Sequence, residues 1–126
     1  MRLNFINAQD FSTSIKCAIH KTGKLGFNSA AITKLGLSTD KGVRLATNSE
    51  DTSDDNLYMM VGDFEEGWFK LVKAGDYYYL NTKALFDDLG INYREKRIIY
   101  DITNFDYDGK NMYKLNKREV KQKESE

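Results

Sequence analysis

The feature that most constrains the fold of this sequence is a pattern of residues that occurs twice. A glycine-containing turn, a short apolar segment, a helical segment and a glycine stop occupy residues 21–37 and return in residues 73–91. Leu35-Gly36-Leu37 matches Leu89-Gly90-Ile91 at a shift of 54, and the glycines of the two turns match at a shift of 52. The shift between matching residues changes by only two along the unit, which indicates single insertions in turns. One unit of about 50 residues is therefore expected twice, and the two copies should pack on each other because neither closes a core alone.

Hydrophobic periodicity assigns the elements within each unit. The first unit predicts strands at 13–20, 25–27, 42–47 and 57–61, with a helix over 28–36. The second predicts strands around 69–73, 77–80, 98–102 and 112–115, with a helix over 81–90 and a hairpin turn at Asp108-Gly109. Asn28 or Ser29 is expected to cap the first helix and Asn81 takes the matching position in the second. Leu35 and Leu89 are expected in the core.

The predicted fold is α+β and mostly β: one barrel-like domain of two pseudo-symmetric repeats about a pseudo-two-fold axis. The domain spans residues 13–115, with repeats at 13–62 and 67–115. Residues 1–12 are expected to form an arm that packs on the body through Leu3, Phe5, Ile6 and Phe11. In residues 116–126 the only apolar residue is Val120, so this basic-rich segment is expected to be a flexible tail.

Composition narrows the function classes. The chain has 126 residues, a formal net charge of zero, and a single cysteine, Cys17, which excludes an intrachain disulfide and a thiolate zinc site. No apolar segment approaches the ~18 residues of a membrane span, and no leader pattern precedes the domain. A cytoplasmic protein without a membrane partner is the expectation, and a homodimer is an open possibility.

Several of these residues resemble a known family. Gly23-Lys24-Leu25-Gly26-Phe27-Asn28, a short helix, Leu35-Gly36-Leu37 and Asp40-Lys41-Gly42-Val43 resemble the swapped-hairpin domain of the AbrB, SpoVT and MraZ regulators. The second unit resembles it through Gly75, Leu89-Gly90-Ile91 and Ile98. The resemblance implies a barrel formed within one chain and sequence-specific binding of duplex DNA. The family's basic turn residue is Lys24 in the first unit but Asp76 in the second, which implies that the first unit makes the contact.

Basic residues of the first unit are the candidate DNA-binding residues. They are Lys16, Lys21, Lys24, Lys34, Lys41 and Arg44. Gathered on one face, such residues attract phosphates. The alternative is an ordinary solvated face. A second candidate is a stacking surface for single-stranded nucleic acid, built from Tyr77-Tyr78-Tyr79, Trp68 and Phe69. Alternation places Tyr77 and Tyr79 on one face and Tyr78 on the other.

Metal and catalytic sites find little support in the sequence. Residues 104–109 space oxygens as a calcium loop does, but Leu115 stands where a bidentate Glu is needed, and residues 51–55 lack the glycine. Both segments are expected to be hairpin turns. His20 and Cys17 lie three apart on a strand and therefore on opposite faces. No enzymatic activity, cofactor or metal is expected.

The sequence therefore predicts a small non-enzymatic DNA-binding protein, a transcriptional regulator of bacterial or phage origin. Two alternatives stay open. One is a structural or protein-interaction module, such as a phage or mobile-element accessory protein. The other is a single-stranded nucleic-acid binder.

Overall fold

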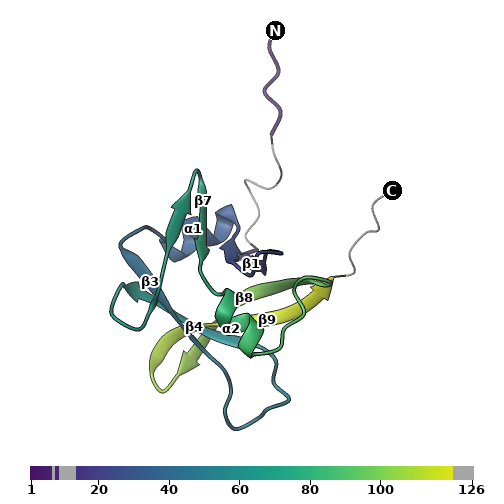
Figure 1. Cartoon of the computed structure of the whole chain (residues 1–126). Coiled ribbons are helices and arrows are strands. Elements are labelled where there is room, and N and C mark those ends of the chain that lie inside the picture. The colour runs from purple at the N-terminus through teal and green to yellow at the C-terminus, as the bar shows by residue number, and fades with distance from the viewer. Residues whose placement is uncertain (7, 9–13, 121–126) are drawn as a thin grey trace.

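The two edge strands of the β-sheet follow each other directly in the chain. The computed structural model describes residues 1–6, 8 and 14–120, and nine antiparallel strands form one sheet in the order β5-β3-β4-β9-β8-β1-β2-β7-β6 (Figure 1). β5 (Phe69–Lys70) pairs with β3, and β6 (Val72–Ala74) pairs with β7. Only Leu71, which is buried, separates β5 from β6. The sheet therefore curls into a nearly closed barrel, and the expectation of a mostly β, barrel-like domain is confirmed.

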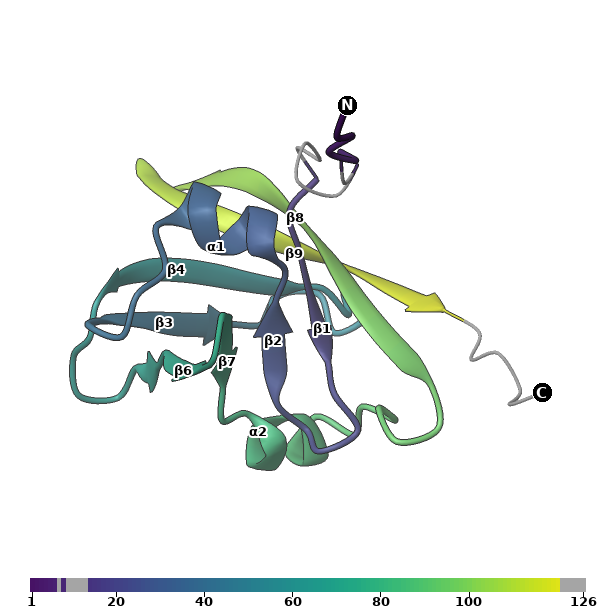
Figure 2. The same ribbon diagram turned by 90° about the horizontal axis from the view of Figure 1, so that it is seen from above.

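The remaining elements follow the predicted order. They are β1 (Lys16–Ile19), β2 (Leu25–Phe27), α1 (Ser29–Leu35), β3 (Lys41–Ala46), β4 (Leu57–Asp63), β7 (Tyr77–Leu80), α2 (Lys83–Asp88), β8 (Arg97–Tyr107) and β9 (Lys110–Val120). In Figure 2, α1 lies near one end of β1 and β2, and α2 lies at the other end, next to the turn between these strands. Alternating residues of the strands fill the interior, because successive side chains of a strand point to opposite faces.

Strand pairing links residues that are far apart in sequence. β1 lies between β2 and β8, with Cys17 opposite both Phe27 and Tyr100. β2 also pairs with β7, and β4 pairs with β9. The first strand of the domain is thus held by a strand that begins at Arg97. The core of the barrel is shared by residues from both halves of the chain.

The two helices end in the same way but begin differently. The Asn28 side chain accepts a hydrogen bond from the Ala31 N–H at 2.9 Å and caps α1, as predicted. Asn81 was expected at the start of α2, but the N-cap position is occupied by Thr82, whose side chain makes no cap hydrogen bond. Gly36 and Gly90 adopt φ of 64° and 71° after the helices, where a side chain would be strained.

The helices bury smaller faces than their sequences predict. Ala31 in α1 and Phe86 in α2 are fully buried. Leu35 is half-buried, and Leu89, expected in the core, keeps 39% of its surface exposed. Each helix is only seven or six residues long and follows the barrel surface for less than two turns. A short helix of this kind places one side chain deep in the core and leaves the next turn near solvent.

The hairpin of β8 and β9 extends further than expected. Asp108 and Gly109 have φ of 52° and 76°, which confirms the predicted tight turn. Residues 116–120 were placed in a flexible tail, but they belong to β9 and pair with residues 97–101 of β8. This prediction was wrong because backbone pairing orders a strand whatever the polarity of its outward side chains. Residues 121–126 lie outside the described part of the chain.

The N-terminal arm does not pack on the barrel in the part that the structure describes. Leu3, Phe5 and Ile6 expose 68%, 87% and 77% of their surfaces, and the arm leads away from the barrel in Figure 1. The prediction that these residues contact the body was therefore wrong. Residues 7 and 9–13, including Phe11 and the predicted start of the domain, lie outside the described residues.

Candidate nucleic-acid interface

The six basic residues proposed from the sequence lie on three parts of the barrel. Lys16, Lys21 and Lys24 belong to β1 and the turn that follows it, Lys34 is in the last turn of α1, and Lys41 and Arg44 are on β3. Three strands, β4, β9 and β8, separate β3 from β1 in the sheet order. β3 therefore lies across the barrel from β1. The six residues do not form one surface.

Both basic residues of β3 are engaged by neighbours. Lys41 Nζ lies 2.8 Å from the Asp63 carboxylate, and this hydrogen-bonded ion pair raises the pKa of Lys41. The Arg44 guanidinium lies 5.9 Å from the centre of the Trp68 ring, within cation–π range. Arg44 and Trp68, predicted for different roles, thus meet on the same part of the surface.

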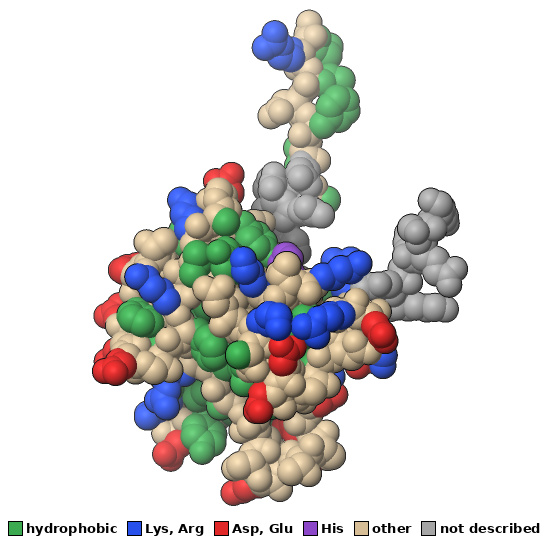
Figure 3. Space-filling model, viewed as in Figure 1, with side chains coloured by type: hydrophobic (Ala, Val, Ile, Leu, Met, Phe, Trp, Pro, Cys, Tyr) green, Lys and Arg blue, Asp and Glu red, His purple; other side chains and the backbone are tan. Residues whose placement is uncertain are grey.

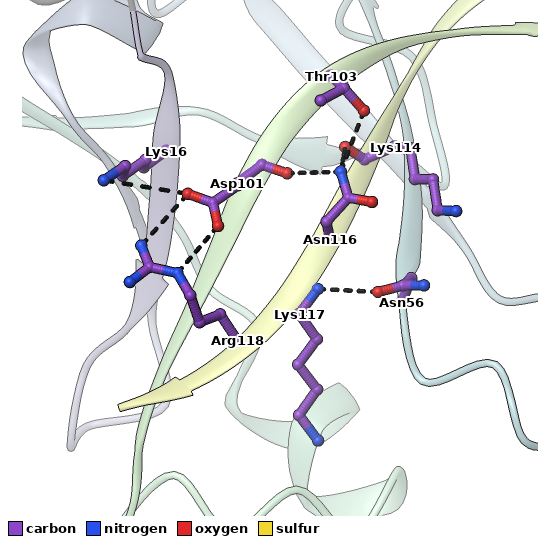
Figure 4. Close-up of polar contacts among 8 residues, drawn as sticks. All are labelled: Lys16, Asn56, Asp101, Thr103, Lys114, Asn116, Lys117 and Arg118. Atoms are coloured by element: carbon purple, nitrogen blue, oxygen red, sulfur yellow. Dashed lines mark hydrogen bonds and ion pairs between the residues drawn. The ribbon is translucent and has the colours of Figure 1, made fainter. Parts of the chain in front are cut away.

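Lys16 belongs to a charged cluster on the outer face of β1, β8 and β9. Arg118 donates to the Asp101 carboxylate from Nε at 2.9 Å and from Nη2 at 3.3 Å, and Lys16 Nζ lies 4.0 Å from the same carboxylate (Figure 4). Two cations surround one anion, so the cluster keeps a net positive charge. Asn116 and Lys117 make further polar contacts nearby that join β9 to β8 and to the loop before β4 (Figure 4).

A hollow lies beside this cluster, where two small residues face each other. Ala18 on β1 is paired with Gly26 on β2, and little side-chain volume fills the outer face between them. The hollow measures about 500 Å³, and Lys16, His20, Tyr77 and Arg97 are among its lining residues. A Cβ added to Gly26 would lie 1.6 Å from the Tyr77 hydroxyl oxygen. The Tyr77 hydroxyl therefore reaches into the space that Gly26 leaves open, and a larger residue there would displace the Tyr77 and His20 side chains.

His20 and Tyr77 close one end of the hollow. His20 Nε2 is hydrogen-bonded to the Tyr77 hydroxyl, and the two rings meet edge to face at 5.4 Å. Partial burial lowers the pKa of His20, and the nearby charges of Lys24 and Arg97 lower it further. Lys24 Nζ lies 4.5 Å from the centre of the Tyr79 ring. This end therefore combines two cations with a histidine that is largely neutral at pH 7.

Positive charge gathers around this hollow. In Figure 3, Lys and Arg side chains lie close to the histidine. The residues near it that carry positive charge are Lys16, Lys24, Arg97 and Arg118. Arg97 and Arg118 were not among the candidates from the sequence. Alternation in β8 and β9 could have placed them on the outer face, but nothing local indicates that β8 lies beside β1.

The three tyrosines of β7 divide as alternation predicts. Tyr78 packs against the core, while Tyr77 contacts His20 and Tyr79 lies under Lys24. Tyr77 therefore lines the positively charged hollow, and Tyr79 is paired with Gly26 on the same outer face.

The cysteine and the two acidic segments, considered for catalysis and for metal binding, occupy structural positions. Cys17 is 1% exposed and points into the core, opposite to His20, and burial raises the pKa of its thiol. Residues 104–109 form the end of β8 and its turn, and residues 51–55 lie in the loop between β3 and β4, so both acidic segments are hairpin connections as predicted. Within residues 1–6, 8 and 14–120, no three His, Cys, Asp or Glu side chains are placed to hold a metal ion.

The chain matches no protein-family model, no curated protein and no solved structure. Neither helix in the described residues is long and apolar enough to cross a membrane.

Proposed function

We propose that this protein binds duplex DNA without catalysing a reaction, and that the outer face of β8, β1 and β2 makes the contact. The observation that carries the proposal is the hollow over Ala18 and Gly26 with Lys16, Lys24 and Arg97 around it. Phosphate oxygens are the ligands that such cations attract, and binding releases counterions from the DNA. The one carboxylate of this cluster, Asp101, is offset by Lys16 and Arg118.

The charge of the molecule is segregated in a way that favours this face. The net charge is zero, yet residues 51–68 contain six acids and no Lys or Arg. This acidic stretch spans the loop before β4, β4 itself and the connection to β5, which lie beyond β9 in the sheet order. A phosphate backbone is therefore attracted to one side of the barrel and repelled by another.

We also propose that the fold is the swapped-hairpin barrel of two repeats that the sequence resembles. β1 pairs with β2 and β8, and the segment of β5 and β6 pairs in the equivalent way with β7 and β3. The helix ends are alike as well: Leu37 N–H donates to the Ile32 carbonyl and Ile91 N–H to the Phe86 carbonyl, both at 3.0 Å. These equivalences support a pseudo-two-fold relation between the halves, and with it a role as a transcriptional regulator of bacterial or phage origin.

A salt titration with a fluorescent random-sequence duplex tests the binding proposal. With about four phosphate contacts, the log–log slope should be about −3.6, so affinity should fall about a hundredfold between about 50 and about 200 mM salt. Lys24→Ala and Arg97→Ala should each weaken binding and flatten the slope by about one unit. Arg44→Ala is the matched control, because it removes a cation from β3 across the barrel.

Two results would contradict the proposal. Equal weakening by Arg44→Ala and Arg97→Ala would show that binding follows overall charge and not this face. A clear preference for an unpaired oligonucleotide, lost in Tyr77→Ala, would favour the single-strand alternative, in which the half-buried tyrosines of the outer face stack on bases.

A further inference from the structure

A second hollow lies at the far end of the long hairpin, between its tip and the loop that joins β3 to β4. It measures about 380 Å³. Residues 46–50 form one wall, and the other is formed by Tyr58, Phe105, Tyr107 and Met112. The function proposed above uses none of these residues.

The aromatic wall is a continuous row of three rings. The ring centres of Tyr58 and Phe105 are 5.0 Å apart and those of Phe105 and Tyr107 are 6.4 Å apart, the latter nearly parallel at 21°. Tyr107 exposes 60% of its surface. A partly open row of ring faces of this kind offers negative electrostatic potential to a ligand beside it.

Hydrogen bonds hold the loop wall in place. The Tyr58 hydroxyl donates to Asp54 at 2.6 Å, and the Asn48 side chain donates to the same carboxylate at 3.2 Å. Asp54 also accepts from the Asn56 N–H at 3.0 Å. The hollow is therefore preorganised, which lowers the entropic cost of binding a partner.

The loop supplies negative charge to the hollow, although one of its carboxylates, Asp55, is paired with Lys117 at 3.7 Å. Residues 47–56 contain four carboxylates and no Lys, Arg or His. Glu50 lines the hollow, and among the described residues it makes no ion pair and accepts no side-chain hydrogen bond. On β9, Lys110 is paired with Tyr107 and Lys114 is paired with both Tyr58 and Thr103, but neither lysine lines the hollow.

We propose that this hollow binds a Lys or Arg side chain from a basic segment of a partner protein. The cation would lie against the faces of Phe105 and Tyr107 while Glu50 provides the counter-charge. An aromatic wall alone would equally suit a nucleic-acid base, but the carboxylates of residues 47–56 repel the phosphates that accompany a base. Charge complementarity therefore selects a cationic protein segment.

The two proposed sites can be occupied together. Arg97 begins β8 and Tyr107 ends it, so about 34 Å of extended strand separates them. The inference does not depend on DNA binding, because it uses different residues with the opposite charge.

The test is an NMR titration of the full-length labelled protein with a hexa-arginine peptide. The matched control peptide replaces each arginine with citrulline, which keeps the shape and removes the charge. We expect the arginine peptide to shift the resonances of Glu50, Tyr58, Phe105 and Tyr107, with little response to citrulline. Glu50→Gln and Tyr107→Ala should each reduce affinity about three- to tenfold. Glu66→Gln, an exposed acid of the β4–β5 connection, should leave it unchanged.

Three outcomes would overturn the inference. The first is equal shifts with both peptides, which would indicate apolar contact without charge recognition. The second is an arginine response confined to other acidic residues and unaffected by Glu50→Gln. The third is a shift of the same resonances by hexathymidylate added alone, which would make the hollow a base-binding site. Thermal denaturation of each variant verifies that the barrel remains folded.

Discussion

At the scale of single residues, Asp54 shows how a loop built of polar residues acquires a defined shape. Its carboxylate accepts hydrogen bonds from the Tyr58 hydroxyl, from the Asn56 backbone and from the Asn48 side chain. These donors lower the pKa of Asp54 from 3.8 to about 2, with the Tyr58 bond as the largest cause. The ionised form is therefore favoured by folding.

The pH dependence of stability follows from this shift. A carboxylate with a lowered pKa in the folded state adds stability that is fully present above its unfolded pKa and is lost as pH falls towards the folded value. We expect Asp54→Asn to lower the melting temperature at pH 7 and to narrow the gap to wild type as pH falls from 3.8 towards about 2. Thermal denaturation followed by circular dichroism at several pH values measures this. A gap that stays constant over this range would show that Asp54 stabilises the loop by other means.

Residue patterns predicted which way side chains face but not what they meet. The spacing of Cys17 and His20 predicted opposite faces, and the structure places one in the core and the other outside. The partner of His20 is Tyr77, 57 residues away. That contact depends on the absence of a side chain at Gly26. The role of this glycine can be recognised only once the register of β1, β2 and β7 is known.

At the scale of elements, Thr82 connects the start of α2 to the turn between β1 and β2. Its buried hydroxyl accepts from the Leu25 N–H at 3.0 Å and donates to the Gly23 carbonyl at 2.9 Å. A Cβ on Gly23 would lie 2.7 Å from Cβ of Lys83, so the turn and the helix are in close contact. The proposed DNA-binding turn is thus positioned by a helix from the other half of the chain.

Substituting Thr82 tests this connection. Thr82→Val keeps the shape but leaves the Leu25 N–H and the Gly23 carbonyl without this partner, so it should cost about 1–3 kcal/mol of the free energy of unfolding. Thr82→Ser retains the hydroxyl and should recover most of the hydrogen-bonding contribution. Urea denaturation of the two variants and wild type gives the comparison. A larger loss in Thr82→Ser than in Thr82→Val would mean that the methyl group, and not the hydroxyl, holds the turn.

Elements with local signals were predicted well, and those defined by distant partners were not. β2 was predicted at its observed bounds, and the Asp108-Gly109 turn followed from residues that tolerate positive φ. The end of β9 was missed because Lys117, Arg118 and Glu119 resemble a solvated tail. Their strand is defined by pairing with β8 and by the contact of Arg118 with Asp101.

At the scale of the whole molecule, the strands of the two halves alternate in pairs around the barrel. β2 pairs with β7, β4 with β9, and β1 with β8. Neither half contains all the partners of its own strands. Folding of one half without the other would expose both the backbone edges and the apolar faces of those strands.

Splitting the chain tests this interdependence. Fragments 1–66 and 67–126 should each lack stable structure alone, whereas an equimolar mixture should regain the strand signal and a cooperative thermal transition. Circular dichroism of the separate and mixed fragments is the measurement. A stable fold in either fragment alone would indicate that one half carries a complete core.

The sequence could not predict where each strand lies around the barrel, and the composition of the candidate site depends on those positions. Alternation predicted that Lys16 and Arg44 face outward, but not that β3 lies across the barrel from β1. The basic surface was therefore proposed with members from both sides, and Arg97 was overlooked.

The pairing of β1 with β8 has a consequence for how the protein is made. β8 begins 78 residues after β1 ends. At ribosomal rates of about 5–20 residues per second, the first strand can pair with β2 early but waits roughly 4–16 s before synthesis of its second partner, β8, begins. During that interval Ile15, Cys17 and Ile19, later in the core, remain accessible to chaperones and to other nascent chains. The yield of native protein in a cell should therefore depend on translation speed between residues 20 and 97, a stretch where synonymous codons alone can change the outcome.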